Sequence, residues 1–600
     1  MAYPRTPAAT AQVRTSVTAD VVVASRVSVW TARRWALLLA AGWLVQAGLR
    51  AWFSRQQAIP LANPDETAYL IAARVLAGGT GANFSGSTLY QGGYPLLITP
   101  VYWFTSNPAT VYHAVLIVNA MISALVLPLG YLACRRLGLD RPAAYGVATI
   151  AALVPAGFFY SEYAMADAVF PVVMLAWLLT VHCWLTATSP RARYAAAVGS
   201  ALLAGFAYTI HSRGLVMLFG YAAVGVLIAW RRPAARGTAA AAALAALVTV
   251  AAGWSLNHYL TAAIYPQGAR SLSRQLRSRL ANANGVIHVF EMAAGQAWRL
   301  TLDSWGIAGI GLLAALAAIG WRGLRPDLRV MAALSIAVTI LIACTAPAAL
   351  PADQSQTWAS GRYLDGMIVT FFLVGAVVLL RASTVRILGY AAAVTGVTVL
   401  ATVIVAVYAG TSVPTGGFSP GFNFAEPAVL TQDWHQANVL LATAVALGLL
   451  AVWIAAVLVV RRWRGRMLMA GLGVLGAGVA AVSLLAVTQM TSHVSQLGAA
   501  SRAVDTTGML TAAGLRPGEQ IAIASNVNAY LWLPQAFEIS WTQPEFFDPA
   551  SQPPANASVV EMSWPAGQPA RASWPGAPAG WRIVASNAGS TWPWVAWRNG

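Results

Sequence analysis

Long apolar segments are the sequence feature that most constrains what this chain can fold into. A helix that crosses a bilayer needs about 20 mostly apolar residues, and about thirteen segments between residues 35 and 489 meet that requirement. Only 9% of the residues are charged and 58% are hydrophobic, whereas soluble domains are roughly a quarter charged. Because so little charge is left to cover a water-facing surface, the sequence predicts an all-α polytopic membrane protein. It excludes a cytosolic enzyme, a secreted disulfide scaffold and a disordered chain.

Arginine supplies every positive charge of the chain, whose formal net charge is +18. It recurs on every second short loop, and under the positive-inside rule those loops face the cytoplasm together with an N-terminal tail at 1–34. The loops contain Arg135, Arg191, Arg231, Arg322, Arg381 and Arg461. An odd number of spans places the C-terminal segment outside a plasma membrane. Since the charge follows the loops, we attribute it to topology and membrane lipid, and we expect no nucleic-acid partner.

The segments expected on the outer side are long, beginning with the loop at 56–110. The segment at 490–600 has a different texture from the apolar module at 35–489. A Pro517-Gly518 turn leads into an apolar strand, and further strands are predicted at 555–564 and 580–586. We therefore expect a small extracytoplasmic α/β domain. Its many Trp residues suit either a small core and a membrane interface or stacking on sugars, and the sequence leaves both open.

Two acidic pairs stand at predicted outer ends of spans, although the chain has only 19 acidic residues. Asp65 and Glu66 follow Pro64 directly, a pattern that simple capping of a helix would also explain. Glu162 and Asp167 lie near the outer mouth of the third and fourth spans. Ionisable groups at membrane depth are costly and usually functional, so both pairs are candidate site residues.

Basic and aromatic residues are expected on the same side. His211 and Arg213 follow a predicted span, and Arg362 and Tyr363 precede another. A guanidinium can bind a phosphate through two hydrogen bonds and can stabilise the charge that develops as the phosphate leaves. A carboxylate can act as general base on a hydroxyl. The combination suits transfer of a group from a lipid phosphate to an acceptor hydroxyl.

The sequence of the first outer loop resembles that of a known family. Its stretches NPDETAYLIAAR (63–74) and YQGGYPLL (90–97) are similar to the acidic loop of the GT-C membrane glycosyltransferases. The closer resemblance is to the branch with protein O-mannosyltransferases and the aminoarabinose lipid A transferase. It implies a GT-C module followed by an outer domain, with inverting transfer of a sugar from a polyprenyl-phosphate donor. The acceptor would be a hydroxyl of a glycan, lipid or protein.

The resemblance also implies roles for particular residues. Asp65 would be the general base, Glu66 its assisting neighbour, and Glu162 or Asp167 the second acid. Arg213 and Arg362 would bind the donor phosphate, with Tyr363 hydrogen-bonded to it. The remaining substrate-binding candidates are Arg74, Tyr94 and His211.

Two questions stay open in the sequence. Asp65, Glu66 and Glu162 form an oxygen-only set that would suit Mg²⁺ or Mn²⁺, yet the loop lacks the Asp-x-Asp pair of metal-dependent relatives. The family's basic residue near a Pro-Pro pair is replaced by Gly93-Tyr94-Pro95. The alternative function is a transporter or flippase for a lipid-linked sugar. Transporters tend to carry internal repeats, and none is visible here.

Overall fold

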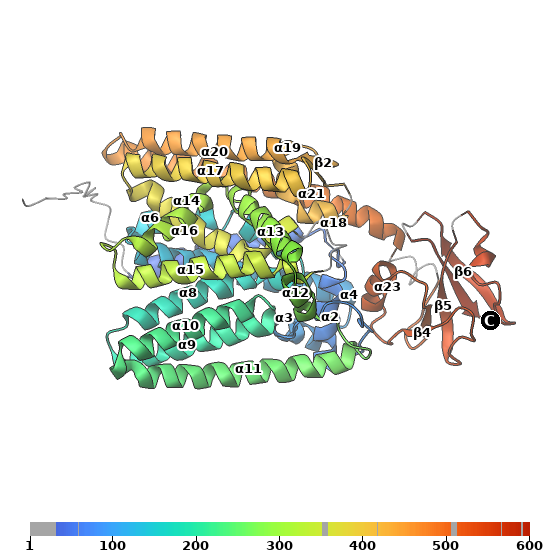
Figure 1. Cartoon of the computed structure of the whole chain (residues 1–600). Coiled ribbons are helices and arrows are strands. Elements are labelled where there is room, and N and C mark those ends of the chain that lie inside the picture. Colours follow the sequence, from blue (N-terminus) through green and yellow to red (C-terminus); the bar gives the residue numbers. More distant parts are fainter. Residues whose placement is uncertain are drawn as a thin grey trace, which may run out of the picture.

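A bundle of helices and a small sheet domain make up the protein (Figure 1). The computed structural model describes residues 32–57, 59–350, 358–416, 418–505, 513–565, 567–589 and 592–600. The expected tail at 1–34 lies almost wholly outside the described residues. The principal helices are α1 (Ala32–Ser54), α4 (Pro108–Ser123), α5 (Val126–Arg136), α6 (Arg141–Ala151), α8 (Phe170–Thr186), α9 (Pro190–Ile210), α10 (Gly214–Arg231), α11 (Arg236–Ile264), α13 (Ala283–Leu302), α14 (Ile307–Gly320), α15 (Pro326–Thr345), α16 (Asp365–Arg381), α17 (Thr384–Tyr408), α20 (Val439–Val460) and α21 (Gly465–Asp505).

Eight helices in the described part of the chain are long and apolar enough to cross a membrane, and two sharply bent helix pairs raise the number to as many as ten. The bent pairs are α6 with the short helices at Pro155–Glu162, at 76°, and α13 with α14, at 117°. The predicted multi-pass architecture is confirmed, but the count of about thirteen spans is not. α8 and α16 have 17 residues each, fewer than the about 20 that a span needs.

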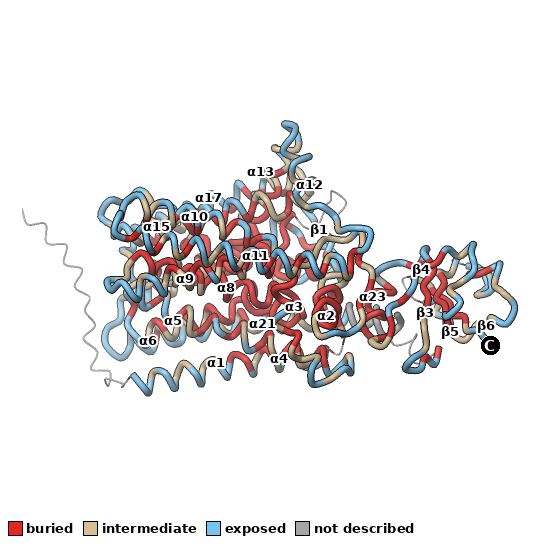
Figure 2. Tube along the Cα trace, turned by 90° about the horizontal axis from the view of Figure 1, so that it is seen from below, coloured by how far each residue is buried: buried red, intermediate tan, exposed pale blue. Residues whose placement is uncertain are grey.

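Apolar side chains cover the outside of the bundle. Val45, Val226, Val385 and Val407 are all more than two thirds exposed. Figure 2 shows α1 as mostly exposed or intermediate, with its buried residues in its C-terminal part, whereas α2 and α3 are mostly buried. Apolar surface on this scale is unfavourable in water and is expected where helices contact lipid.

The first long loop is folded into the bundle. It contains α2 (Asp65–Leu76), α3 (Gly93–Ile98) and the short helix η1 (Thr99–Trp103). Every residue of α2 from Glu66 to Val75 is buried. The loop is therefore a fixed part of the scaffold, and it holds the side chains at the start of α2 in place.

Several short elements complete the bundle. They are η2 (Phe159–Glu162), η3 (Ala166–Ala168), α12 (Leu272–Leu280), η7 (Gly361–Tyr363), α18 (Phe418–Asn423), α19 (Ala425–Thr431) and the paired strands β1 (Ser412–Pro414) and β2 (Gln436–Asn438). Figure 1 shows α2, α3, α12 and α18 at the end of the bundle next to the sheet domain.

The described part of the C-terminal domain has a five-stranded mixed sheet with strand order β4-β3-β5-β7-β6, the helix α23 and the short helix η8 (Ala570–Ser573). The elements are β3 (Gln520–Ala524), α23 (Ala529–Glu538), β4 (Glu545–Phe547), β5 (Ala557–Ser563), β6 (Trp581–Asn587) and β7 (Trp594–Asn599). The predicted α/β character is confirmed. Trp574, Trp594 and Trp597 are buried, which favours the core interpretation of the Trp residues. Residue 490, where we expected this domain to begin, lies within α21.

Candidate functional site

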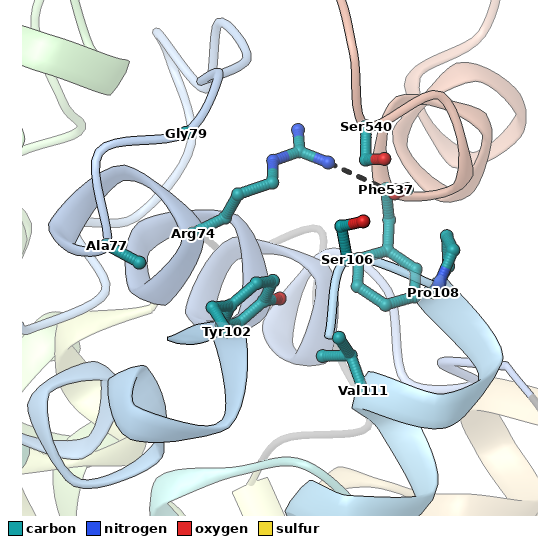
Figure 3. Close-up of a pocket in the computed structure, with 9 residues that line it drawn as sticks. All are labelled: Arg74, Ala77, Gly79, Tyr102, Ser106, Pro108, Val111, Phe537 and Ser540. Atoms are coloured by element: carbon teal, nitrogen blue, oxygen red, sulfur yellow. Dashed lines mark hydrogen bonds between the residues drawn. The ribbon is translucent and has the colours of Figure 1, made fainter. Parts of the chain in front are cut away.

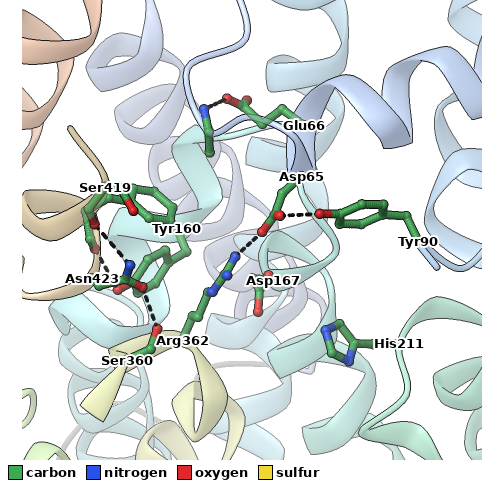
Figure 4. A network of polar contacts seen from close by, with 12 residues as sticks. Asp65, Glu66, Tyr90, Tyr160, Asp167, His211, Ser360, Arg362, Ser419 and Asn423 are labelled. Carbon is green, nitrogen blue, oxygen red and sulfur yellow. Dashed lines mark hydrogen bonds and ion pairs between the residues drawn. The ribbon is translucent and has the colours of Figure 1, made fainter. Parts of the chain in front are cut away.

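The first residue of α2 forms the centre of a polar cluster at the sheet-domain end of the bundle (Figure 4). Asp65 Oδ2 pairs with the guanidinium of Arg362, from η7, and Asp65 Oδ1 accepts a hydrogen bond of 2.7 Å from Tyr90 Oη. The side chains of Asp65 and Arg362 are 23% and 18% exposed. This ion pair is therefore held by neighbours yet remains accessible from outside.

A second ion pair lies deeper in the same cluster. Arg213 pairs with Asp167, and each side chain is 4% exposed. Arg213 Nη1 also donates to the backbone carbonyls of Arg362, at 2.6 Å, and Tyr363, at 3.2 Å. The buried pair thus supports the backbone from which the partly exposed guanidinium of Arg362 extends.

Electrostatics fix the charges of the groups around the pair. Burial alone would lower the pKa of Arg362, but Asp65 and Asp167 raise it well above its ordinary value, so the guanidinium stays charged. Burial and the charges of Arg213 and Arg362 lower the pKa of His211 well below its usual range. His211 Nδ1 accepts hydrogen bonds from the backbone and side chain of Arg213, as a neutral imidazole can.

The Tyr363 hydroxyl also keeps its proton. Burial raises the pKa of Tyr363 to about 12, so its proton is retained at neutral pH. No hydrogen-bond partner for this buried hydroxyl exists among the described residues. A protonated hydroxyl next to two guanidiniums can donate to an anion that these guanidiniums bind.

Glu66 does not join the cluster, although it adjoins Asp65 in sequence. Its carboxylate is fully buried and accepts hydrogen bonds from the backbone N–H groups of Leu61, Ala62 and Ala164 and from Tyr112 Oη, at 2.5 to 2.7 Å. These contacts tie the start of α2 to the segment between η2 and η3. The structure therefore places Glu66 where it stabilises the loop.

Glu162 does not join the cluster either. It is fully buried and accepts a 2.7 Å hydrogen bond from Thr491 Oγ1 on α21. The extended backbone at Tyr163 and Met165 separates it from Asp167, the acid that meets Arg213. Of the two candidates for the second acid, Asp167 therefore meets Arg213 in the cluster, and Glu162 does not.

Tyr94 and Arg74 also contact other parts of the protein. Tyr94 is buried, and its hydroxyl donates to Asn119 at 3.0 Å. Arg74 donates to the carbonyls of Thr80, Ala536 and Phe537, at 2.7 to 3.1 Å, and so joins α2 to the C-terminal end of α23.

Arg74 lines a cavity of about 130 Å³ between the loop and the sheet domain (Figure 3). Arg74 lies about two and a half helical turns beyond Asp65, and the two side chains therefore leave opposite sides of α2. The cavity is therefore separate from the polar cluster.

The described residues contain no group of three His, Cys, Asp or Glu side chains placed to hold a metal ion. Asp65 faces Arg362, while Glu66 and Glu162 have other partners on other segments. The oxygen-only set considered for Mg²⁺ or Mn²⁺ is thus not assembled by these described residues.

Tyr90 is the partner of Asp65 that the sequence did not single out. It belongs to the YQGGYPLL stretch, but only its 2.7 Å contact with Asp65, 25 residues away, distinguishes it. Its hydroxyl stays protonated, because burial and the charge of Asp65 raise its pKa well above the ordinary value.

Comparisons with known proteins bear on the family and the fold of the chain. The model of the dolichyl-phosphate-mannose-protein mannosyltransferase family matches residues 86–259. The crystal structure of ArnT from Cupriavidus metallidurans bound to undecaprenyl phosphate matches with a TM-score of 0.55 and 17% identity, covering 95% of this chain and 99% of that chain. Its apo state gives a TM-score of 0.53 and 18% identity, covering 95% and 98%. No curated protein matches the chain.

The cryo-EM structure of arabinosyltransferase EmbB from Mycobacterium smegmatis gives a TM-score of 0.39 and 13% identity, covering 81% of this chain and 43% of that chain. The ArnT matches show that the chain has the ArnT fold. The expected resemblance to the GT-C glycosyltransferases, in the branch of O-mannosyltransferases and the lipid A transferase, is confirmed.

Proposed function

We propose that this protein is an inverting glycosyltransferase that moves a sugar from a polyprenyl-phosphate donor to an acceptor hydroxyl at the outer face of the plasma membrane. The observation that carries the proposal is the accessible Asp65–Arg362 pair, supported from beneath by Arg213 and Asp167. The ArnT fold and the mannosyltransferase family match support it, as does the undecaprenyl phosphate bound in one of the matching ArnT structures.

In this proposal the N-terminal tail at 1–34 is cytoplasmic. The module at 35–489 spans the membrane and the segment at 490–600 lies outside. The arginine-rich loops support this orientation. The donor's polyprenyl chain would remain in lipid, and the acceptor would be a glycan, a lipid or a protein.

The donor phosphate would bind Arg362. A phosphate on this guanidinium competes with Asp65, because both are anions that seek the same N–H donors. The unpartnered Tyr363 hydroxyl adds a further donor. Arrival of the donor would thereby free Asp65 from its ion pair at the moment when a base is required.

The transfer itself is a single displacement. The acceptor hydroxyl gives its proton to Asp65 while its oxygen bonds to the anomeric carbon of the sugar. The bond between that carbon and the phosphate oxygen breaks, and polyprenyl phosphate leaves with the electron pair. Arg362 stabilises the charge that grows on the leaving phosphate. Attack opposite the leaving group inverts the anomeric centre.

The test is Asp65→Asn. The substitution removes the base but keeps the size of the side chain, so transfer from a polyprenyl-phosphate sugar should be abolished. Binding of undecaprenyl phosphate should persist or tighten, because the competing anion on Arg362 is gone. Radiolabelled donors from a panel of hexoses and pentoses would be incubated with the purified full-length protein.

The matched control is Glu545→Gln in the sheet domain, which should leave transfer unchanged. Wild-type turnover by the Asp65→Asn variant would remove Asp65 from the role of base. If the wild-type protein consumed no donor of the panel and bound no undecaprenyl phosphate, the proposed function would be wrong.

A further inference from the structure

A second cluster of buried charges lies behind the segment that carries Arg362. Arg299 on α13 pairs with Glu426 on α19, and its Nε lies 3.3 Å from Asp303 Oδ2 at the end of α13. All three side chains are at most 1% exposed. Charges this deep are costly unless they are paired, so the three groups fix one another's positions.

The cluster contacts the site segment directly at Gly361. A Cβ added to Gly361 would overlap Arg299 Nη2 and would lie 3.2 Å from Asp303 Oδ2. The backbone therefore runs immediately over the guanidinium, and only glycine fits there. The next residue in the chain is Arg362, whose own guanidinium holds Asp65.

α13 and α18 also contact the residues before Gly361. Gln296, one turn before Arg299 on α13, donates to the carbonyl of Trp358 at 2.7 Å. Ser360 Oγ donates to Asn423 Oδ1, at the end of α18, at 3.0 Å (Figure 4). Trp298 stacks on Trp358 with ring centroids 6.3 Å apart. Segment 358–361 is thus clamped between α13 and α18–α19.

From these contacts we infer that Arg299, bridging Glu426 and Asp303, is a positioning residue that sets where Arg362 meets the donor phosphate. This inference rests on the proposed function. Arg299 does not touch the phosphate. It fixes the position of the backbone at Gly361. The adjoining carbonyls of Arg362 and Tyr363 accept hydrogen bonds from Arg213. The buried guanidinium of Arg299 therefore supports the segment that aligns the guanidiniums of Arg213 and Arg362.

The experiment is a double-mutant cycle on the full-length protein, purified in detergent and titrated with undecaprenyl phosphate. The Gly361→Ala variant pushes a methyl group into the Arg299 guanidinium and should raise the Kd about tenfold, since small misplacements of a binding group are costly. Arg299→Lys removes the overlapping Nη2. The double variant should therefore bind about threefold more tightly than Gly361→Ala alone, a non-additive result. The control is Gly396→Ala on α17, where a Cβ meets nothing within 4 Å, and its Kd should not change.

A purely structural role would lower the amount of folded protein without changing the Kd of the folded fraction. The inference is overturned if Gly361→Ala binds like the wild type, or if the two single effects simply multiply in the double variant. Should Gly361→Ala not purify in a folded state, Glu426→Gln takes its place. It keeps the side-chain size but removes the ion pair, so its Kd should rise, and a wild-type Kd would overturn the inference.

Failure of the proposed function looks different, because in that case the wild-type protein itself binds no undecaprenyl phosphate.

Discussion

Adjacent residues on one helical turn have separate tasks in this protein. Successive residues of an α-helix point about 100° apart, so the neighbouring carboxylates of Asp65 and Glu66 meet different surroundings. The Asp65 side chain is 23% exposed beside Arg362, whereas Glu66 is fully buried among N–H and O–H donors. The DE pair could be recognised in the sequence, but its division into an accessible acid and an anchoring acid could not.

Glu66→Gln should destabilise the fold. Four donors converge on the two carboxylate oxygens, and an amide would turn two of its hydrogens toward them. We expect a loss of about 3 kcal/mol, as for a charge-assisted hydrogen bond left unmade. Thermal unfolding in detergent measures it. A variant with unchanged stability but no transfer would instead make Glu66 part of the chemistry.

The loop between α2 and α4 is shaped by helix contacts that small residues allow. A Cβ on Gly93 would lie 2.5 Å from the backbone of Thr209, so α3 begins in direct contact with α9. Asn257 Oδ1 on α11 accepts a hydrogen bond of 2.8 Å from the Gly92 N–H. The glycines of the YQGGYPLL stretch allow this close packing.

Gly93→Ala tests that packing. The added methyl group must push α3 away from α9, at a cost of about 1–3 kcal/mol that is typical of overpacking. Gly199→Ala, on α9 itself, adds a methyl group with nothing within 4 Å and serves as the control. The thermal midpoint should fall for the first variant only. Equal midpoints would show that the loop is not held by this contact.

The sheet domain carries a pH-dependent link between its ends. Hydrogen bonds from Arg598 on β7, at 2.5 and 3.3 Å, lower the pKa of Glu519. A carboxyl whose folded pKa lies below its unfolded value, about 4.3, contributes stability above that pH. The contribution is lost as pH falls through the folded pKa.

Glu519→Gln should therefore weaken the domain at pH 7 and make it less sensitive to acid. Amide hydrogen exchange of β3 and β7 in the full chain, corrected for intrinsic rates, measures both effects. Parallel acid profiles for the variant and the wild type would contradict the link.

At the scale of the whole molecule, α21 and the contacts of α2 with α23 connect the bundle to the sheet domain in the described part of the chain. α21 runs on from the bundle toward the domain, and Arg74 on α2 binds the last carbonyls of α23. Burial lowers the pKa of Arg74 to about 10, so it is still charged at neutral pH. The helix that begins with Asp65 thus also holds the sheet domain.

Arg74→Met should loosen that junction. It leaves the carbonyls of Thr80, Ala536 and Phe537 without their donors, so amides of α23 should exchange faster. Arg582→Met on the exposed side of β6 is the control and should leave α23 unchanged. Unchanged exchange in the Arg74 variant would mean that the hydrogen bonds of Arg74 do not hold α23 in place.

The sequence by itself determined the properties that depend on contiguous residues. Apolar run length gave the multi-pass class, and turns between short apolar runs gave the strands at 555–564 and 580–586. Charged residues at the predicted outer ends of spans indicated Asp65, Arg213 and Arg362 as candidates. Each of these signals is local, so one stretch of chain is enough to reveal it.

Only the tertiary structure decided which of these side chains meet. Asp65 and Arg362 are 297 residues apart, and Arg299 and Glu426 are 127 apart. Asp167 rather than Glu162 faces Arg213, because the chain runs extended between η2 and η3 and turns the two acids toward different helices. Such choices depend on the packing of several helices at once, and no spacing within a single segment encodes them.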